Sequence, residues 1–338
     1  MNFEKLCQTA RDLVAPGKGI LAADESSGTI QKRFDSISVP STADNRRDYR
    51  ELLFTTPGVE EAISGVILYD ETLRQESSSG KRLAEVLADR NIIPGIKVDA
   101  GAKPLAGCPG ESVTEGLDGL ADRLAEYVNL GARFAKWRAV IDISDTLPSA
   151  HCIEVNAHAL ARYAALCQEY DLVPIVEPEV LMDGDNGIER CEEVTTNVLH
   201  ATYHQLHLQG VKLEGTLLKP NMVLPAKQSG ETATPEEVAE ASLRAYYRSV
   251  PAAVPGIVFL SGGQSPEEAT LNLNAMNALG SHPWELSFSY GRALQQPVLQ
   301  AWLGEADNGL MAQEAFHTVA MANHQARYGT YEPAMAVA

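Results

Sequence analysis

Eight short, strand-like apolar segments recur along the chain, and helical patterns separate them. Their ranges are Gly19–Ala23, Gly65–Tyr69, Ile93–Val98, Arg133–Trp137, Val173–Glu177, Gly215–Lys219, Gly256–Leu260 and Leu286–Tyr290. Several are continuously apolar, as expected of strands buried on both faces of a parallel sheet. Strands that alternate with helices indicate a parallel α/β fold, and eight repeats favour closure over an open sheet. We therefore predict a (β/α)8 TIM barrel.

Clear helix signals lie between these segments. Thr234-Pro235-Glu236-Glu237 and Ser265-Pro266-Glu267-Glu268 each combine a hydroxyl cap, a proline in the first turn and an acid three residues after the cap. Leucines at helical spacing predict a helix over Glu115–Leu130, which Gly131 would end. We expect one catalytic barrel domain over residues 1–325 and a short mobile tail over residues 326–338.

Composition excludes several classes of partner. The 338 residues carry a net charge of −18, which argues against nucleic acid and anionic membranes, because both attract basic surfaces. No apolar stretch is long enough to span a membrane, and the N-terminus lacks the apolar core of a secretory signal. The five cysteines are odd in number and form no CxxC pair, as expected of free thiols in a reducing cytosol. We expect a cytoplasmic protein.

Polar and charged residues gather at the carboxyl ends of the predicted strands. They are Asp24, Lys97, Asp99, Lys136, Arg138, Glu177, Glu179, Lys219, Ser261-Gly262-Gly263 and Gly291-Arg292. In a barrel these ends meet on one face, and active sites form there.

Two of these residues, Lys136 and Lys219, have apolar or aromatic neighbours in the sequence. A buried lysine loses hydration, which lowers its pKa, and a neighbouring cation acts in the same direction. The neutral amine is a nucleophile that forms a Schiff base with a ketone. For either lysine alone, an ion pair with a carboxylate is the commoner explanation. Spacing does not choose between the two.

Schiff-base chemistry also needs acids and bases, and Asp24, Glu177 and Glu179 are candidates. Asp24 has an alternative role as a helix cap, because Asp24-Glu25-Ser26-Ser27-Gly28 resembles a helix start. The alternative for the two glutamates is ion pairing with the lysines and Arg138, which is compatible with catalysis because such pairs tune pKa values.

Two regions favour phosphate binding. Ser261-Gly262-Gly263 leads into a capped helix, and Arg292 follows the last strand, so backbone N–H groups and a guanidinium could hold one phosphate; the alternative is a tight structural turn. A second anion site is expected near Ser26, Thr29, Arg33 and Lys97. Two such sites across one barrel mouth suit a bisphosphate.

Three histidines, His200, His204 and His207, fall at helical spacing. No HExxH motif or cysteine cluster accompanies them, so we expect a surface or packing role. We predict no metal site and no cofactor.

Seven motifs together closely resemble the class I fructose-bisphosphate aldolases, and the likeness runs in order from about Leu6 to Tyr331. They are Leu21-Ala22-Ala23-Asp24-Glu25-Ser26, Gly95-Ile96-Lys97-Val98-Asp99, Ala135-Lys136-Trp137-Arg138, Val176-Glu177-Pro178-Glu179, Leu217-Leu218-Lys219-Pro220-Asn221-Met222, Leu260-Ser261-Gly262-Gly263-Gln264-Ser265 and Ser289-Tyr290-Gly291-Arg292-Ala293-Leu294.

The resemblance implies a role for each candidate. Lys219 matches the Schiff-base lysine, and Lys136 would stabilise charge beside it. Glu177 matches the acid/base of carbinolamine dehydration, and Asp24 would take the C4 hydroxyl proton as C3–C4 breaks. Ser261, Gly262, Gly291 and Arg292 match the site for the ketose 1-phosphate. Ser26, Thr29 and Lys97, with Arg138 nearby, fall where the family holds the distal phosphate.

The implied reaction is metal-independent, reversible cleavage of fructose 1,6-bisphosphate to dihydroxyacetone phosphate and glyceraldehyde 3-phosphate, a step of glycolysis and gluconeogenesis. The resemblance also implies a homo-oligomer, commonly a tetramer. The alternatives are another Schiff-base lyase or transferase acting on a phosphorylated keto sugar, a metal-dependent aldolase and a non-catalytic barrel scaffold. Retention of Lys219, Lys136, Glu177 and Asp24 together argues against the scaffold.

The chain departs from the family pattern at two places. Animal members end in a tyrosine that aids proton exchange, whereas this chain ends without one, so Tyr328 and Tyr331 are weak candidates to replace it. Position 100 is alanine where many relatives carry lysine, which reduces the positive charge near the distal phosphate site.

Overall fold

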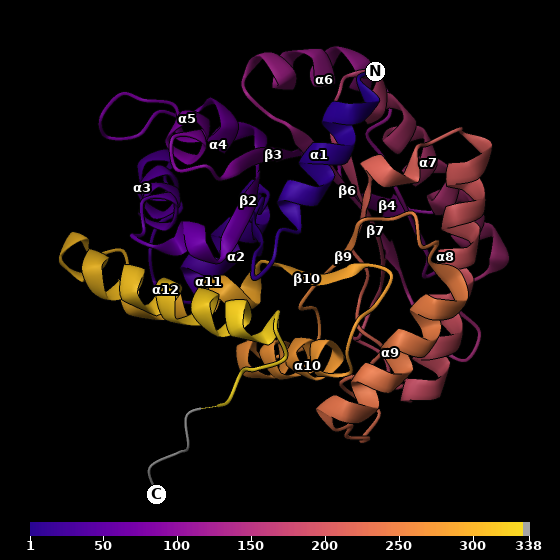
Figure 1. Cartoon of the computed structure of the whole chain (residues 1–338). Coiled ribbons are helices and arrows are strands. Elements are labelled where there is room, and N and C mark those ends of the chain that lie inside the picture. The colour runs from indigo at the N-terminus through magenta and orange to yellow at the C-terminus, as the bar shows by residue number, and fades with distance from the viewer. Residues whose placement is uncertain (334–338) are drawn as a thin grey trace, which may run out of the picture.

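The predicted strands form a closed parallel barrel, so the TIM-barrel prediction is confirmed (Figure 1). The structure, a computed structural model, describes residues 1–333. Around the barrel the strand order is β1-β10-β9-β8-β7-β6-β3-β2. The strand bounds are Gly19–Ala23 (β1), Ile63–Leu68 (β2), Ile93–Lys97 (β3), Phe134–Ile141 (β6), Val173–Val180 (β7), Leu217–Leu218 (β8), Gly256–Phe259 (β9) and Glu285–Tyr290 (β10). An antiparallel pair, Ala102–Pro104 (β4) and Ser112–Thr114 (β5), lies outside the barrel.

Helices surround the barrel (Figure 1). Their bounds are Phe3–Leu13 (α1), Ser27–Asp35 (α2), Ala43–Phe54 (α3), Asp70–Arg74 (α4), Leu83–Ala88 (α5), Leu120–Asn129 (α6), Ala150–Glu169 (α7), Ile188–Leu208 (α8), Pro235–Ser249 (α9), Pro266–Ala278 (α10), Arg292–Trp302 (α11) and Gly309–Ala326 (α12). Short 3-10 turns occur at Val59–Glu61, Leu213–Gly215 and Ala306–Asn308. Both predicted capping boxes are present, at Thr234 before α9 and at Ser265 before α10.

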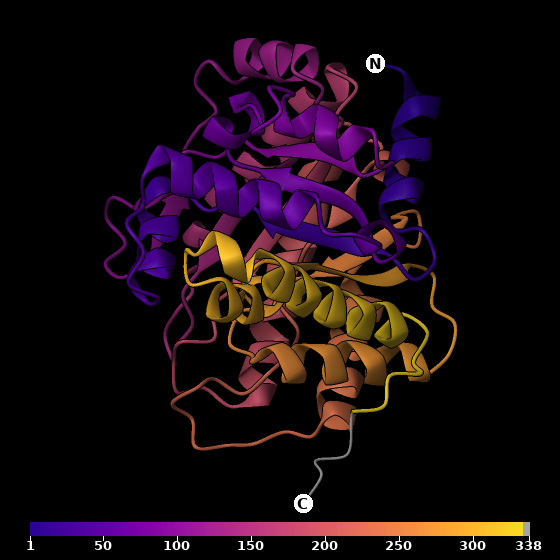
Figure 2. The same ribbon diagram turned by 90° about the vertical axis from the view of Figure 1, so that its left-hand side faces the viewer.

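The first helix closes the amino end of the barrel. Leu6, Ala10 and Leu13 of α1 pack in one buried cluster with strand residues that include Phe134 and Val173. At the C-terminus, α12 lies along the outside of the barrel between α3 and α10, as Figure 2 shows. With the amino end covered by α1, the carboxyl ends of the strands are left to form the site.

Two strands continue past their predicted ends. β6 runs to Ile141 and β7 to Val180, and the two pair in register through Arg138↔Glu177 and Val140↔Glu179. The charged side chains of Arg138, Glu177 and Glu179 therefore lie within strands, whereas sequence reasoning took them to mark strand ends. β8, in contrast, ends at Leu218, so Lys219 immediately follows it.

The helix predicted over Glu115–Leu130 begins later, at Leu120. Residues 112–114 instead pair with residues 102–104, and Gly116 and Gly119 both have positive φ (127° and 65°). A backbone with positive φ interrupts a right-handed helix. The end of the helix agrees with prediction, because Gly131 also has a positive φ of 101°.

The first residues of the predicted tail are attached to the barrel. The buried Arg327 guanidinium donates to backbone carbonyls of Val14 and Lys18, and the Tyr331 N–H donates to Asn274 Oδ1 at 2.8 Å. Residues 334–338 lie outside the described part, so the boundary at residue 325 and the mobility of the tail stay predictions. Among residues 1–333, no helix is both long and apolar enough to cross a membrane.

Candidate active site

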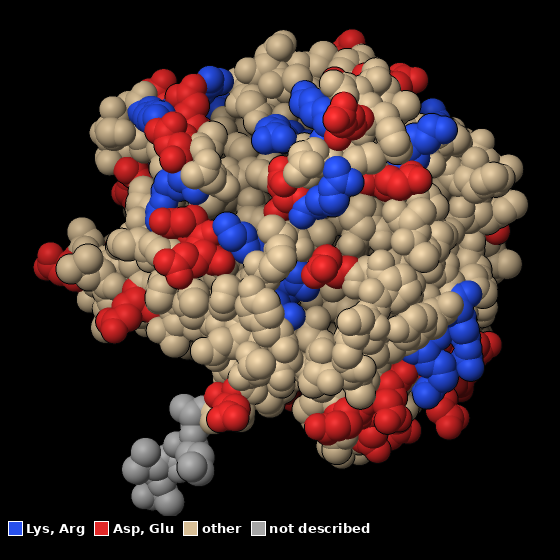
Figure 3. Space-filling model, viewed as in Figure 1, with Lys and Arg blue, Asp and Glu red and all other residues tan. Residues whose placement is uncertain are grey.

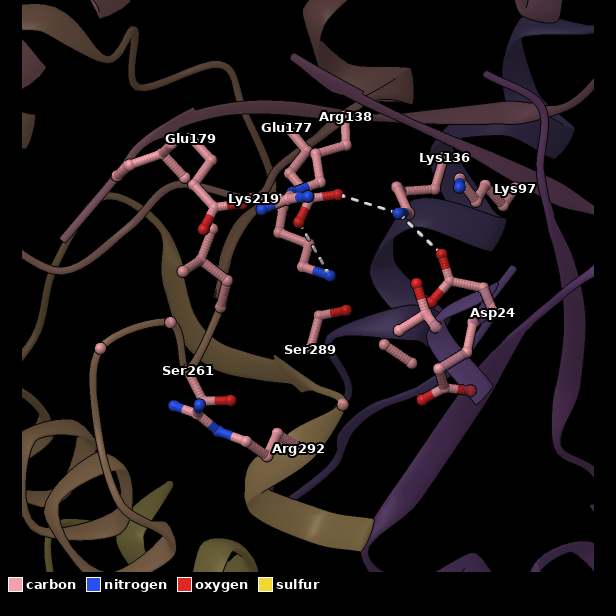
Figure 4. A pocket seen from close by; sticks show the side chains of 18 of the residues that line it. Asp24, Lys97, Lys136, Arg138, Glu177, Glu179, Lys219, Ser261, Ser289 and Arg292 are labelled. Carbon is pink, nitrogen blue, oxygen red and sulfur yellow. Dashed lines mark hydrogen bonds and ion pairs between the residues drawn. The ribbon is translucent and has the colours of Figure 1, made fainter. Parts of the chain in front are cut away.

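A cavity of about 390 Å³ lies at the carboxyl ends of the barrel strands. It is lined by every catalytic and phosphate-binding residue predicted from sequence: Asp24, Ser26, Thr29, Arg33, Lys97, Lys136, Arg138, Glu177, Glu179, Lys219, Ser261, Gly262, Gly291 and Arg292. Several different strands and loops contribute these side chains, and Figure 4 shows them converging on one space. Convergence of this kind at a barrel's carboxyl end is typical of an active site.

Lys136 stands at the centre of a buried chain of charges (Figure 4). Its Nζ lies 2.7 Å from Asp24 Oδ2 and 3.1 Å from Glu177 Oε2. The other oxygen of the same glutamate, Oε1, lies 3.2 Å from Lys219 Nζ. Glu177 therefore bridges the two lysines, one on each carboxylate oxygen.

The carboxylates decide the charge of Lys136. Burial lowers the pKa of Lys136, but attraction to Asp24 and then Glu177 outweighs burial, so this pKa is raised above its ordinary value. Of the two alternatives that the sequence left open for Lys136, a neutral amine and an ion pair, the geometry favours the ion pair. Lys136 is an ammonium ion.

The two carboxylates are correspondingly held as anions. Burial raises the pKa of Asp24, but Lys136 and Lys219 outweigh it and leave this pKa well below the usual range. The pKa of Glu177 is lowered as well, since the same two lysines overcome its burial. Asp24 is thus available to accept a proton at neutral pH.

The residues predicted for the first anion site lie in the loop after β9 and at the start of α11. Gly263 in that loop has a φ of +82°, which favours glycine, and a Cβ at this position would lie 2.7 Å from Met182 Cβ. Arg292, the first residue of α11, donates from Nη2 to the Gln264 carbonyl at 3.0 Å. Figure 4 shows Arg292 beside Ser261. The glycine loop, the guanidinium and the amino ends of α10 and α11 together suit a phosphate.

A second group of polar residues lines the other side of the cavity. Ser26 Oγ and Thr29 Oγ1 lie 3.1 Å apart at the start of α2, and Lys97 Nζ lies 3.4 Å from Asp99 Oδ1. Arg138 pairs with Glu179. These hydroxyl and ammonium groups are suited to a second anion.

Arg33 lies beside Gly291. It pairs with Glu25, and a Cβ on Gly291 would lie 3.5 Å from its Nη2. It therefore sits near the Arg292 subsite, whereas the sequence grouped it with the distal one.

Sequence reasoning missed four polar residues of the cavity lining: Glu25, Asp183, Lys227 and Ser289. Ser289 Oγ is buried and, within residues 1–333, has no hydrogen-bond partner. A serine inside the apolar segment Leu286–Tyr290 was a usable signal. Lys227 pairs with Asp183 at 2.7 Å across two loops, and neither loop has strand or helix periodicity that would have indicated the contact.

The structure also shows where Asp24 and the three histidines lie relative to the helices. Asp24 does not cap a helix, because α2 begins at Ser27 with Ser26 as its N-cap. The three histidines are exposed on α8, and His200 Nε2 lies 2.9 Å from the Arg248 carbonyl. Among the described residues no group of three or more His, Cys, Asp or Glu side chains could hold a metal ion.

Neither candidate replacement for the terminal tyrosine lines the cavity. The Tyr328 hydroxyl lies beside Gly17, which precedes β1 and so marks the opposite end of the barrel.

The fold and the cluster of lysines and carboxylates define a (β/α)8-barrel lyase. A family model described as fructose-bisphosphate aldolase class-I matches residues 5–338. The chain belongs to the class I fructose-bisphosphate aldolase family.

Individual relatives that match nearly the whole chain carry the same family name. A probable fructose-bisphosphate aldolase class 1 of Xanthomonas campestris pv. campestris is 56% identical over 333 residues, which cover 98% of this chain and 100% of that protein. Cytosolic fructose-bisphosphate aldolase 4 of Arabidopsis thaliana is 56% identical over 97% of this chain and 84% of that protein. The solved fructose-bisphosphate aldolase of Plasmodium falciparum, in complex with TRAP and a small-molecule inhibitor, superposes with a TM-score of 0.97 at 51% identity, covering 98% of this chain and 96% of that one.

Proposed function

We propose that the buried Asp24–Lys136–Glu177–Lys219 chain carries out the reaction of this family in this protein. As a class I fructose-bisphosphate aldolase, the chain reversibly cleaves fructose 1,6-bisphosphate to dihydroxyacetone phosphate and glyceraldehyde 3-phosphate. The observation that carries the assignment of roles is the Glu177 carboxylate, which lies within 3.2 Å of the Nζ atoms of both lysines.

Lys219 is the nucleophile in this proposal. Lys136 has two carboxylates within 3.1 Å and is held as a cation, so its lone pair is unavailable. Within residues 1–333, Lys219 pairs with one carboxylate only. Glu177, held as a carboxylate, first takes a proton from Lys219, whose Nζ then attacks the C2 carbonyl carbon. The protonated Glu177 gives this proton to the carbinolamine hydroxyl, which leaves as water. The product is an iminium ion on Lys219.

Asp24 then acts as the base. Its carboxylate takes the proton of the C4 hydroxyl, the C4–O bond becomes a carbonyl, and the C3–C4 electron pair moves into the iminium to give an enamine. Glyceraldehyde 3-phosphate leaves as the aldehyde product. Protonation of the enamine at C3 and hydrolysis release dihydroxyacetone phosphate and restore Lys219. The Lys136 ammonium, 2.7 Å from Asp24, stabilises negative charge throughout.

Phosphate binding orients the ketose. Ser261, Gly262, Gly291 and Arg292 would hold the 1-phosphate, while Ser26, Thr29, Lys97 and Arg138 would hold the distal phosphate. Arg33, which lies beside Gly291, would join the first group. The cavity offers seven lysine or arginine side chains against five carboxylates, so its lining is locally positive in a chain of net charge −18.

An Asp24→Asn variant tests the division of roles. Asparagine cannot accept the C4 proton, so we expect the rate of bisphosphate cleavage, measured in EDTA, to fall by about 10²–10⁴-fold. Borohydride trapping of the dihydroxyacetone phosphate Schiff base should persist, because it needs Lys219 and Glu177 only. Asp183→Asn, at an exposed residue of the cavity lining, is the matched control and should keep both the cleavage rate and the trapping. Loss of trapping in Asp24→Asn, or full cleavage activity, would refute this role.

Assembly and location follow from the family likeness. Relatives from Arabidopsis thaliana and Spinacia oleracea are named cytosolic or cytoplasmic, which supports a cytoplasmic location here. The homo-oligomer, a tetramer, rests on the resemblance, and light scattering of the purified protein tests it.

A further inference from the structure

A buried glutamine, Gln295, lies behind the cavity in the first turn of α11. Its Nε2 donates to the Ala22 carbonyl at 2.8 Å and to Glu25 Oε1 at 2.7 Å. Its Oε1 accepts from the Tyr49 hydroxyl at 3.1 Å and from Arg50 Nη1 at 3.4 Å. Both amide hydrogens and both lone pairs of the oxygen are used, so the amide has a single satisfied orientation.

The two groups that accept from Nε2 flank Asp24 in the sequence. Ala22 lies two residues before it, and Glu25 follows it directly. Arg50 Nη2 lies 2.5 Å from Glu25 Oε2, and Arg33 also pairs with this carboxylate. Burial raises the pKa of Glu25, but these two cations outweigh burial and lower it, so Glu25 is a fixed anion. The backbone that carries Asp24 is therefore held on both sides by one amide.

The same glutamine belongs to the helix that begins with Arg292. Its backbone N–H donates to the Gly291 carbonyl at 3.0 Å, and Arg292 is held separately through its bond to the Gln264 carbonyl. The side chain of Gln295 thus joins the β1–α2 loop to α11. Its hydrogen bonds reach neither Lys219 nor Glu177, which lie at β8 and on β7.

We propose that Gln295 is a positioning residue for the carbon–carbon cleavage step. It fixes the loop so that the Asp24 carboxylate meets the C4 hydroxyl of a sugar bound on Lys219, and it takes no part in forming the Schiff base. This inference rests on the role proposed for Asp24. If Gln295 only filled space in the core, its replacement would slow Schiff-base formation and carbon–carbon cleavage to the same extent.

The variant Gln295→Met keeps the length of the side chain and removes all four hydrogen bonds. We expect kcat for cleavage of fructose 1,6-bisphosphate to fall about 10- to 100-fold, since small displacements of a catalytic group have effects of this size. The rate of borohydride trapping with dihydroxyacetone phosphate should stay within about threefold of wild type. Gln295→Glu keeps the shape of the side chain and replaces the amide donor. It should likewise lower kcat for cleavage and leave the trapping rate unchanged, and it is the variant to use if Gln295→Met folds poorly.

Gln168→Met is the matched control. Gln168 is a buried glutamine of α7 whose Nε2 donates to the Lys212 and Gly215 carbonyls at 2.8 and 3.2 Å, and it does not line the cavity. Its variant should leave both rates within about threefold of wild type. Equal losses of trapping and cleavage in the Gln295 variants, or an unchanged kcat, would overturn the inference. Failure of the wild-type protein to be trapped would instead overturn the proposed function.

Discussion

The two carboxylates beside Lys136 decide its charge. Burial alone favours the neutral form of a lysine amine, and no local sequence pattern shows which charged partners the fold will place beside it. Lys136 has Asp24 and Glu177 within 3.1 Å and remains a cation, whereas the only ion pair of Lys219 among residues 1–333 is with Glu177. The two lysines, alike in their sequence surroundings, are thereby suited to different tasks.

The low pKa of Asp24 makes a prediction about stability and pH. A carboxyl group whose pKa is lower in the folded than in the unfolded state stabilises the fold above its unfolded pKa, and this stabilisation is lost as the pH falls. We expect the difference in unfolding free energy between wild type and Asp24→Asn to be constant above about pH 5 and to move in favour of the variant below about pH 4. Urea unfolding of both proteins at pH values from about 7 down to about 3 measures this difference.

Asp183→Asn provides the comparison for this titration. Asp183 is exposed and its partner Lys227 is about half exposed, so the pair should contribute little at any pH. A wild-type advantage over Asp24→Asn that grows as the pH falls would contradict the lowered pKa.

Strands and helices could be predicted from the sequence where their apolar or capping pattern was regular. Apolar strand segments and capping boxes depend on local sequence, so the barrel and the starts of α9 and α10 could be read directly. The continuation of β6 and β7 through charged residues could not, because it depends on pairing between strands far apart in sequence. The late start of α6 follows from the positive φ of Gly116 and Gly119 and from the backbone hydrogen bonds of Glu115 with Ala100 and Gly101.

The site was predictable for a related reason. Because all the barrel strands are parallel, their carboxyl ends lie at one face, and polar residues at these ends converge whatever their separation in sequence. The residues that escaped prediction, such as Lys227 and Asp183, sit in loops, and their contact depends on loop conformation. Gln295 escaped because a glutamine inside a helix carries no local signal of its partners in the β1–α2 loop.

The loop after β9 offers a test at the scale of an element. Gly263→Ala would place a Cβ 2.7 Å from Met182 Cβ on a backbone with φ of +82°. We expect the strain to cost about 1–3 kcal/mol of stability and the displaced phosphate loop to raise KM for fructose 1,6-bisphosphate by about tenfold or more. Steady-state kinetics and thermal unfolding measure the two effects.

Gly80→Ala separates the two effects. Gly80 has a similar φ of +80°, but a Cβ there would meet nothing within 4 Å. This variant should lose stability through backbone strain and keep its KM. An unchanged KM in Gly263→Ala would show that the loop does not set phosphate binding.

At the scale of the whole molecule, the charge of the cavity opposes that of the surface. The chain carries −18 overall, and acidic side chains are spread among basic ones on the face shown in Figure 3. The cavity lining, in contrast, has more cations than carboxylates. A bisphosphate is therefore repelled at long range and attracted at contact distance.

This opposition predicts an unusual dependence on salt. Between about 10 mM and 150 mM ionic strength the screening length falls from about 30 Å to about 8 Å, which removes long-range repulsion before it weakens contacts inside the cavity. We expect kcat/KM for fructose 1,6-bisphosphate to rise over this range, and to rise less for fructose 1-phosphate, which carries less charge. A steady fall for the bisphosphate would show that the surface charge does not reach the substrate.

The central claim is that Lys219 forms the covalent intermediate, and borohydride trapping tests it most directly. The protein is incubated with dihydroxyacetone phosphate in EDTA, reduced, digested and mapped by mass spectrometry, with Lys219→Met as the control. The account predicts a reduced adduct on Lys219 and none in the variant. An adduct on Lys136 would contradict the assignment of roles, and the absence of any adduct in a protein that cleaves the sugar only with an added divalent metal would contradict the Schiff-base mechanism itself.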